Sequence, residues 1–267
     1  MVKIIDYDDF NSDNKISISQ ERNPAHRSVF LFKIKKTLKQ YNYLLIRNFG
    51  TDIEQFKQLN HSISEQLYFS ERIGSYLHSF KTELYSENLS ECAKSGEFHT
   101  DFSFQENSPH YISLQCITPD PKYPFLGRNY VASVNTIVEV LVQQFHQNIE
   151  TLLNLLLPYS FGDKVIWVNP FYQDNNGKII MKIHLSLVDV SLLRAEHYIN
   201  DIPITLIIAH IALDCSDDFV LNQGDVLILS NKYLLHKRGE CSISIQSSAN
   251  KENKFYKSRQ MNSMRFY

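Results

Sequence analysis

Hydrophobic positions near the start of the chain follow a helical period and then a strand-like run. Phe30, Ile34 and Leu38 recur at helical spacing, which predicts a helix over residues 29–41. The continuous apolar run at residues 43–46 has the length of a buried strand. A second helical stripe follows, made by Ile53, Phe56, Leu59, Ile63 and Leu67. Thr51 and Glu54 have the spacing of a capping box, so we expect this second helix to begin there.

The rest of the chain alternates between polar stretches and short apolar runs. Residues 71–95 are polar and irregular and predict a loop, and residues 136–156 predict a helix. Runs of strand character lie at 97–104, 111–117, 165–168, 178–190, 204–213 and 226–229. Many strands, with the helices mostly early, favour a mainly β fold with flanking helices. We expect a jelly roll (a double-stranded β-helix) that forms one domain over residues 1–267.

Composition and charge narrow the class of protein. The 267 residues are 43% hydrophobic and 21% charged, and the net charge of -2 gives no electrostatic footprint for nucleic acid. The sequence has no apolar stretch of the length of a membrane span or a secretory signal. Four cysteines without a CxxC pair are typical of thiols in a reducing compartment. We therefore expect a cytoplasmic protein that binds a small-molecule substrate, and neither nucleic acid nor a membrane.

The strongest chemical signal is His99-Thr100-Asp101, within a stretch that alternates polar and apolar residues from Gly96 to Phe104. Residues two apart in a strand share a face, so His99 and Asp101 are expected to point the same way, with Glu97 and Ser103. An imidazole beside a carboxylate supplies two thirds of the facial triad that binds non-haem iron(II) with open positions for oxygen chemistry.

A distant histidine must complete such a triad. His236 follows a Gly224-Asp225 turn, an apolar strand and a second turn at residues 231–232, an arrangement that can return it beside His99. His184 and His210 are the rival ligands, each within an apolar run where a histidine packed in the core is the alternative. We predict His99, Asp101 and His236 as the metal ligands.

At this point the chain resembles the TauD/TfdA, clavaminate-synthase-like group of iron(II)- and 2-oxoglutarate-dependent oxygenases. Three segments carry the resemblance: residues 43–49 with the helix that follows, the H-x-D stretch at 98–104, and the distal histidine segment from Gly224 to Arg238. Asp101 and His236 are 135 positions apart (236 minus 101), a separation that suits this group. The resemblance implies iron(II) as cofactor, 2-oxoglutarate as cosubstrate and dioxygen as oxidant. An intact Asp101 favours hydroxylation, because related halogenases lack this carboxylate.

The resemblance also implies a cation for the far carboxylate of 2-oxoglutarate. Arg259 on a late strand matches that arginine by pattern, although it lies 23 residues past His236, farther than usual. Arg265 and Arg238 are the alternatives. Relatives often place a threonine after the position of Gly127 to bind the same cosubstrate, and Tyr130 falls near that position, with core packing as its alternative.

The substrate is less well specified. The loop before the H-x-D stretch, where relatives often hold substrate, contains Arg72, Ser75, Tyr76 and His78. Arg238 is a further cation near the predicted site. Arginines beyond the one assigned to 2-oxoglutarate favour a carboxylate-bearing substrate such as an amino acid or a derivative, unless they are solvated surface charges. Two other functions remain open: a zinc-dependent hydrolase on the same ligands, and a non-catalytic jelly-roll binding module.

Overall fold

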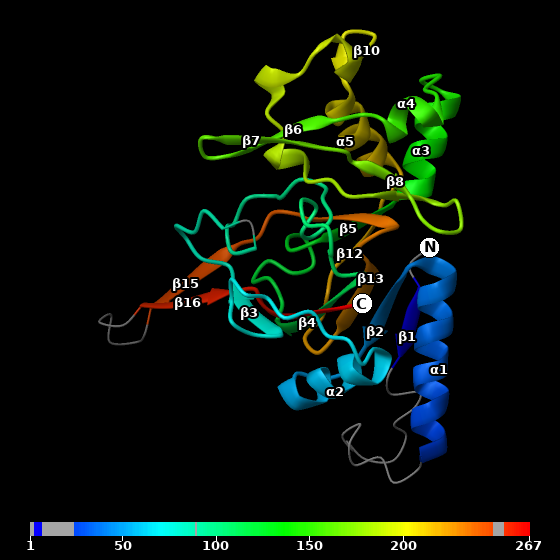
Figure 1. Cartoon of the computed structure of the whole chain (residues 1–267). Helices are drawn as coiled ribbons and strands as arrows, with labels where there is room; N and C mark the ends of the chain where they lie inside the picture. The colour runs from blue at the N-terminus through cyan, green and yellow to red at the C-terminus, as the bar shows by residue number, and fades with distance from the viewer. Residues whose placement is uncertain (1–2, 7–23, 89, 248–253) are drawn as a thin grey trace.

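Two facing β-sheets form the centre of the computed structural model, which describes residues 3–6, 24–88, 90–247 and 254–267 (Figure 1). The larger sheet has the order β1-β2-β13-β4-β17-β3 and the smaller β12-β5-β14. The larger comprises β1 (Ile4–Asp6), β2 (Tyr43–Arg47), β3 (Leu77–Lys81), β4 (Tyr111–Thr118), β13 (Val226–Ser230) and β17 (Gln260–Phe266). The smaller comprises β5 (Asn129–Ser133), β12 (Asp217–Phe219) and β14 (Leu234–Arg238).

Helices and short hairpins surround the two sheets. The helices are α1 (Pro24–Tyr41), α2 (Ile53–Ile63), α3 (Val134–Gln143), α4 (Ile149–Leu153) and α5 (Ile204–Asp214), with 3-10 turns η2 (Leu185–Leu187), η3 (Val190–Leu192) and η4 (Ala195–His197). Four antiparallel pairs complete the described elements: β6 (Leu157–Phe161) with β7 (Lys164–Val168), β8 (Phe171–Gln173) with β9 (Ile179–Met181), β10 (Tyr198–Ile199) with β11 (Ile202–Pro203), and β15 (Ile243–Ser247) with β16 (Lys254–Ser258).

Alternation along β13 divides the interior into separate cores. Val226 and Ile228 pack with α1 and α2 on one face of the larger sheet. Leu227 and Leu229 point the other way, into the core between the two sheets. Since successive side chains of a strand point to opposite faces, one apolar strand serves both cores. A third core lies on the outer face of the smaller sheet, around α3 and α5.

The Gly224-Asp225 turn that launches β13 is a structural junction. Gly224 has a φ of 83°, and a Cβ there would lie 3.0 Å from the backbone of Gly50. The carboxylate of Asp225 is fully buried and accepts from the guanidinium of Arg47 and, over 2.6 Å, from the backbone N–H of Asn222. The turn therefore joins β13 to the end of β2, and β14 carries His236 from there.

Several predicted elements are confirmed, and the boundaries of others change. The helix at 29–41 and the strands at 43–46, 111–117, 165–168 and 226–229 correspond to α1, β2, β4, β7 and β13. The second helix is capped by Asp52, not Thr51, because the Asp52 side chain accepts from the N–H of Gln55. That helix ends at Ile63. The loop predicted over 71–95 contains β3, which adds an edge strand to the larger sheet.

Four other predictions are wrong. Residues 204–213 form helix α5, because a continuous apolar run does not by itself distinguish a strand from a buried helix. The helix predicted over 136–156 breaks into α3 and α4, and His146 between them has a φ of 53°. The strand at 178–190 is limited to β9, followed by 3-10 turns. Residues 101–104 form a turn in place of a strand, with Phe102 at a φ of 56°.

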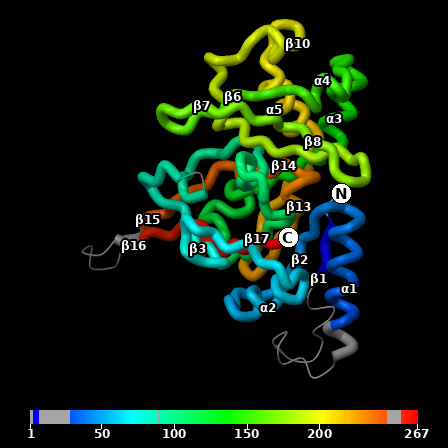
Figure 2. Tube along the Cα trace, viewed as in Figure 1, coloured from blue at the N-terminus to red at the C-terminus, as the bar shows by residue number. Residues whose placement is uncertain are grey.

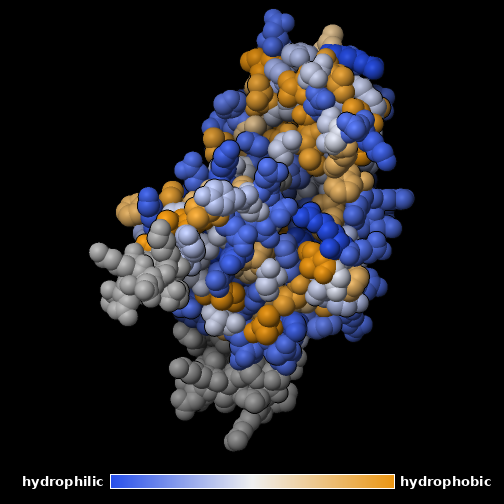
Figure 3. Space-filling model, turned by 90° about the vertical axis from the view of Figure 1, so that its left-hand side faces the viewer, coloured by the Kyte–Doolittle hydropathy of each residue, from blue (hydrophilic) through white to orange (hydrophobic). Residues whose placement is uncertain are grey.

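The chain trace places α1 and α2 on one side of the sheets and α3 to α5 beyond the other (Figure 2). On the face shown in Figure 3, hydrophobic residues are prominent in the upper part, which holds the β6–β7 hairpin, and hydrophilic ones across the middle. Trp167 on β7 is 40% exposed. Among the described residues, no helix has both the length and the apolar character that a membrane span needs.

Candidate metal centre

His99 and His236 meet as neighbours across the backbone. The N–H of each donates to the carbonyl of the other over 3.0 Å, so their side chains share a face. His236 lies opposite Val131 of β5, which belongs to the core between the sheets. The two imidazoles therefore point into the space between the sheets, with ring centroids 4.2 Å apart.

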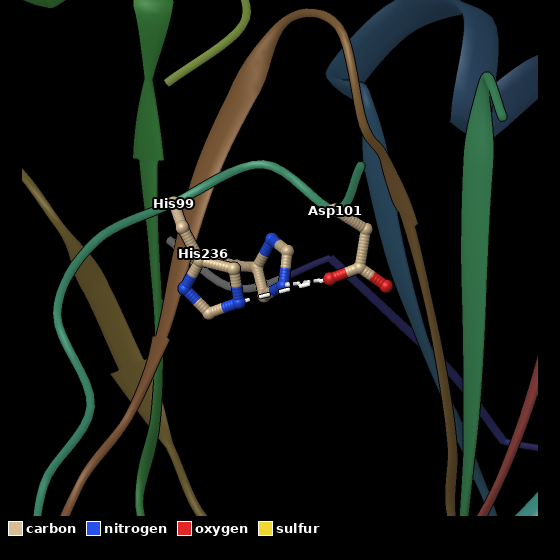
Figure 4. Close-up of side chains that lie close together, drawn as sticks. All are labelled: His99, Asp101 and His236. Carbon is tan, nitrogen blue, oxygen red and sulfur yellow. Dashed lines mark ion pairs between the residues drawn. The ribbon is translucent and has the colours of Figure 1, made fainter. Parts of the chain in front are cut away.

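Asp101 completes a convergent group of three (Figure 4). Its Oδ1 lies 3.7 Å from Nε2 of His99 and 3.5 Å from Nε2 of His236. Of the described residues, these form a group whose metal-ligating atoms all lie within 4.8 Å of one another. Two imidazoles and one carboxylate are the donor set of facial iron(II) sites. The predicted constellation is thus brought together, although residues 101–104 form a turn.

The protonation of His99 suits metal binding. Its Nδ1 lies 2.8 Å from the carbonyl oxygen of Glu97. A carbonyl only accepts, so Nδ1 carries the proton and Nε2 keeps its lone pair toward Asp101. Burial, with the neighbouring His236 and His184, lowers the pKa of His99 to about 3. The imidazole is therefore neutral near pH 7, as a metal ligand must be.

Asp101 is held as a charged carboxylate by a cation behind it. Nε of Arg265 donates to Oδ2 over 2.6 Å. Burial alone would raise the pKa of Asp101, but the guanidinium of Arg265 and the two histidines hold it well below its ordinary value. Oδ1 is left facing the imidazoles. Arg265, one of the alternatives for the cosubstrate arginine, thus contacts a predicted metal ligand.

Asn231 fixes the backbone of Asp101. Its Oδ1 accepts from the N–H of Asp101 over 2.7 Å, and its Nδ2 donates to the carbonyls of Asp101 and Pro109 over 2.8 and 3.0 Å. Asn231 is buried and lies in the turn between β13 and β14. Sequence reasoning assigned this residue only to a turn. Its side chain takes the place of a strand partner, which explains why Asp101 can leave the extended backbone.

Arg259 lies buried between the two sheets. Its Nη2 donates to Oδ1 of Asn129 on β5 over 2.9 Å. Burial lowers the pKa of its guanidinium, while the sulfur atoms of Cys241 and Cys116 act in the opposite direction. Among the described residues, the side-chain partners of Arg259 are the amide of Asn129 and the sulfur of Cys241, and neither is a carboxylate. Its guanidinium can therefore pair with an acidic ligand.

The prediction for Tyr130 is corrected by the alternation of β5. Val131 faces the core between the sheets, whereas Tyr130 packs with the outer core around α3 and α5. Tyr130 therefore points away from Arg259. Asn129, one residue earlier, occupies the inward position. The period of two in a strand was the signal that could have identified Asn129 once the face of its neighbour was known.

Only one of the loop residues predicted to bind substrate faces the centre. His78 pairs with Ser263 of β17, so it shares the face of Arg265. Burial lowers the pKa of His78, and the charge of Arg265 lowers it further, whereas the charge of Asp101 acts in the opposite direction. Ser75 and Tyr76 instead line a groove of about 670 Å³ beside α2. Its floor includes Met264, which belongs to the opposite face of the sheet.

The remaining predicted residues have other contacts. Arg72 is exposed and its guanidinium lies 3.4 Å from Oδ1 of Asn88. Arg238 donates from Nη2 to the carbonyls of Cys92 and Lys94 over 2.7 and 2.9 Å, so it holds a loop. Of the two rival ligands, His210 is exposed on α5. His184 stacks on His99 with ring centroids 4.6 Å apart, beside the centre but outside the group of three.

Comparison with known proteins agrees with this geometry. The model of the family described as taurine catabolism dioxygenase TauD, TfdA family, matches residues 21–169, more than half of the chain. The chain belongs to the TauD/TfdA family. It is therefore an oxygenase that depends on iron(II) and 2-oxoglutarate. No curated protein matches its sequence.

Solved structures of TauD-like oxygenases share the fold. An asparagine oxygenase in complex with Fe(II), 2S,3S-3-hydroxyasparagine and succinate has a TM-score of 0.69 at 12% identity, covering 91% of this chain and 79% of that one. A taurine dioxygenase from Burkholderia xenovorans has a TM-score of 0.62 at 13% identity, covering 95% and 85%. The oxygenase OrfP, in complex with Fe, succinate and (3S)-hydroxy-L-Arg, has a TM-score of 0.60 at 14% identity, covering 92% and 81%.

Proposed function

We propose that this chain hydroxylates an unactivated C–H bond of a small carboxylate-bearing molecule, such as an amino acid or a derivative. His99, Asp101 and His236 hold the iron(II), and Arg259 with Asn129 holds the far carboxylate of 2-oxoglutarate. The two facing sheets are inferred to form a jelly roll within a single domain. The observation that carries the proposal is the convergence of two imidazoles and one carboxylate oxygen between the sheets.

The donor set fits the proposed metal. Nε2 of both histidines and Oδ1 of Asp101 point toward one another, and Oδ2 of Asp101 is already bound by Arg265. One carboxylate oxygen thus remains for the metal, which leaves other coordination positions for small ligands. Bound iron(II), with 2-oxoglutarate and dioxygen, supplies the oxidant that removes hydrogen from a C–H bond.

The protein's own residues orient these partners. Arg259 offers a guanidinium fork to a carboxylate, and Asn129 fixes one of its nitrogens over 2.9 Å. The apolar core between the sheets excludes water around them. His78 and His184 border the centre from two different segments and are inferred to face the substrate.

Two structural neighbours support the substrate class. The asparagine oxygenase carries a hydroxylated asparagine and OrfP a hydroxylated arginine. Both ligands are small amino acids with a carboxylate, a class that the sequence also favours. A screen of amino acids identifies which of them this protein takes as its substrate.

The decisive test is succinate release by iron-loaded protein supplied with 2-oxoglutarate, oxygen and a panel of amino acids. We expect release that depends on iron and is stimulated by one substrate class, with a product one oxygen atom heavier. Asp101→Ala should abolish iron binding and turnover, while Asp163→Ala, a change outside the site, should retain both. Hydrolysis with zinc and without 2-oxoglutarate, or tight substrate binding without turnover, would instead favour the hydrolase or the binding module.

A further inference from the structure

The sulfur atoms of two of the four cysteines contact the same guanidinium, that of Arg238. Nη1 of Arg238 is 2.9 Å from the sulfur of Cys241, and Nη2 is 3.5 Å from the sulfur of Cys92. The two cysteines are 149 residues apart (241 minus 92) in the sequence. Their convergence is therefore a product of the tertiary structure, and nothing in the proposed reaction uses them.

The backbone holds these two segments together. The N–H of Cys241 donates to the carbonyl of Ala93 over 2.9 Å, and the N–H of Gly96 donates to the carbonyl of Arg238 over 2.9 Å. The residue that pairs with Cys241 is thus the one directly after Cys92, so the two thiols lie on neighbouring segments. Disulfides span Cα separations of about 4.4–6.8 Å, which requires neighbouring segments of this kind.

The two thiols differ in access to solvent. Cys92 is half-buried, whereas Cys241 is buried with 7% of its surface exposed. Cysteines in electropositive and partly exposed surroundings are those that react with peroxides, and a second thiol nearby captures the oxidised sulfur. Arg238 supplies the positive charge, Cys92 the accessible sulfur and Cys241 the adjacent partner.

We propose that Cys92 and Cys241 form a reversible disulfide, with a peroxide as the oxidant. The sulfur of Cys92 attacks one oxygen of hydrogen peroxide, the O–O bond breaks, and water leaves behind a sulfenic acid. The thiol of Cys241 then attacks that sulfur, and the oxygen departs as a second water. Two thiols and one peroxide give one disulfide and two waters. Disulfides of this transient kind are the ones found in reducing compartments.

Oxidation would alter the surroundings of the proposed cosubstrate arginine. The sulfur of Cys241 lies beside the buried guanidinium of Arg259 as well as that of Arg238. The bond would also tie the segment that leads into His99 to the one that follows His236. We therefore expect the oxidised protein to require more 2-oxoglutarate for half-maximal turnover, and dithiothreitol to reverse the change.

The first measurement is independent of activity. Reduced full-length protein is treated with hydrogen peroxide, alkylated and examined by intact mass and peptide mapping. We expect a loss of two hydrogen masses and a Cys92–Cys241 cross-linked peptide, both removed by dithiothreitol. Cys215→Ser, which changes a thiol at the end of α5, should still form the cross-link, and Cys92→Ser should not.

The design separates this inference from the proposed function, because the cross-link is detected whether or not turnover is found. Cys241→Ser provides a second loss-of-cross-link variant, with its circular dichroism spectrum checked against the wild type. Oxidation of Cys92 to sulfinic or sulfonic acid without a cross-link, or a cross-link from Cys92 to Cys116, overturns the proposal. So does a cross-link found only between two chains.

Discussion

Arg265 donates from Nε to Oδ2 of Asp101 over 2.6 Å and leaves Oδ1 turned toward His99 and His236. The residues are 164 positions apart, on β17 and on the turn at 101–104. The guanidinium also lies over the ring of Phe102, 5.3 Å from its centroid. Arg265 is thus a positioning residue for the proposed metal ligand.

Arg265→Gln should weaken iron binding about 10- to 100-fold, the usual cost of losing a group that orients a metal ligand. The reason is that Asp101 loses its charged partner and can rotate. Competition with a chelator measures the affinity, and the absorption spectrum of the cobalt(II)-loaded protein reports the ligand geometry. Arg194→Gln, a change beside Trp167, is the control. Unchanged affinity and an unchanged cobalt spectrum would contradict the positioning role.

Asn231→Ala should destabilise the protein by about 2–4 kcal/mol, because three hydrogen bonds to buried backbone groups are lost. Urea unfolding of the metal-free protein measures this change. The matched substitution Asn154→Ala removes an exposed amide, and we expect less than about 1 kcal/mol for it. Equal losses for the two variants would show that the Asn231 network has little energetic weight.

Arg259→Ala should raise the KM for 2-oxoglutarate about 10- to 100-fold, the effect of losing a hydrogen-bonded charge partner, while iron binding is retained. Asn129→Ala should cause a smaller rise, since it removes only the partner that orients one nitrogen. Steady-state kinetics and the chelator assay make the two measurements. If Arg259→Ala behaves like the wild type, the cosubstrate arginine must be Arg265 or Arg238.

The metal-free protein should lose stability as the pH falls from about 6.5 toward 4. In the folded protein, burial lowers the pKa of His99 to about 3 and that of His184 to about 4. In this window the unfolded chain binds protons that the folded protein does not, so acid favours unfolding. Urea midpoints at pH 7 and pH 5, with a chelator present, test this. His184→Phe should reduce the difference, and equal midpoints in the wild type would contradict the mechanism.

The sequence by itself identified the three candidate ligands and the family. His99 and Asp101 were found from a local spacing of two, and His236 from the turn and apolar strand before it. These signals can be recognised in the sequence alone because a strand's period and a turn's composition are local properties. The strand assigned to residues 97–104 was wrong, yet the predicted convergence of the three side chains is confirmed.

The tertiary structure alone decided which distant segments meet. It separated Arg265, bound to Asp101, from Arg259, bound to Asn129. It turned Tyr130 outward and folded residues 204–213 as a helix against the smaller sheet. It also brought Cys92 and Cys241 to one guanidinium. Contacts between residues more than 100 positions apart depend on sheet register and on packing between layers, and local periodicity contains neither.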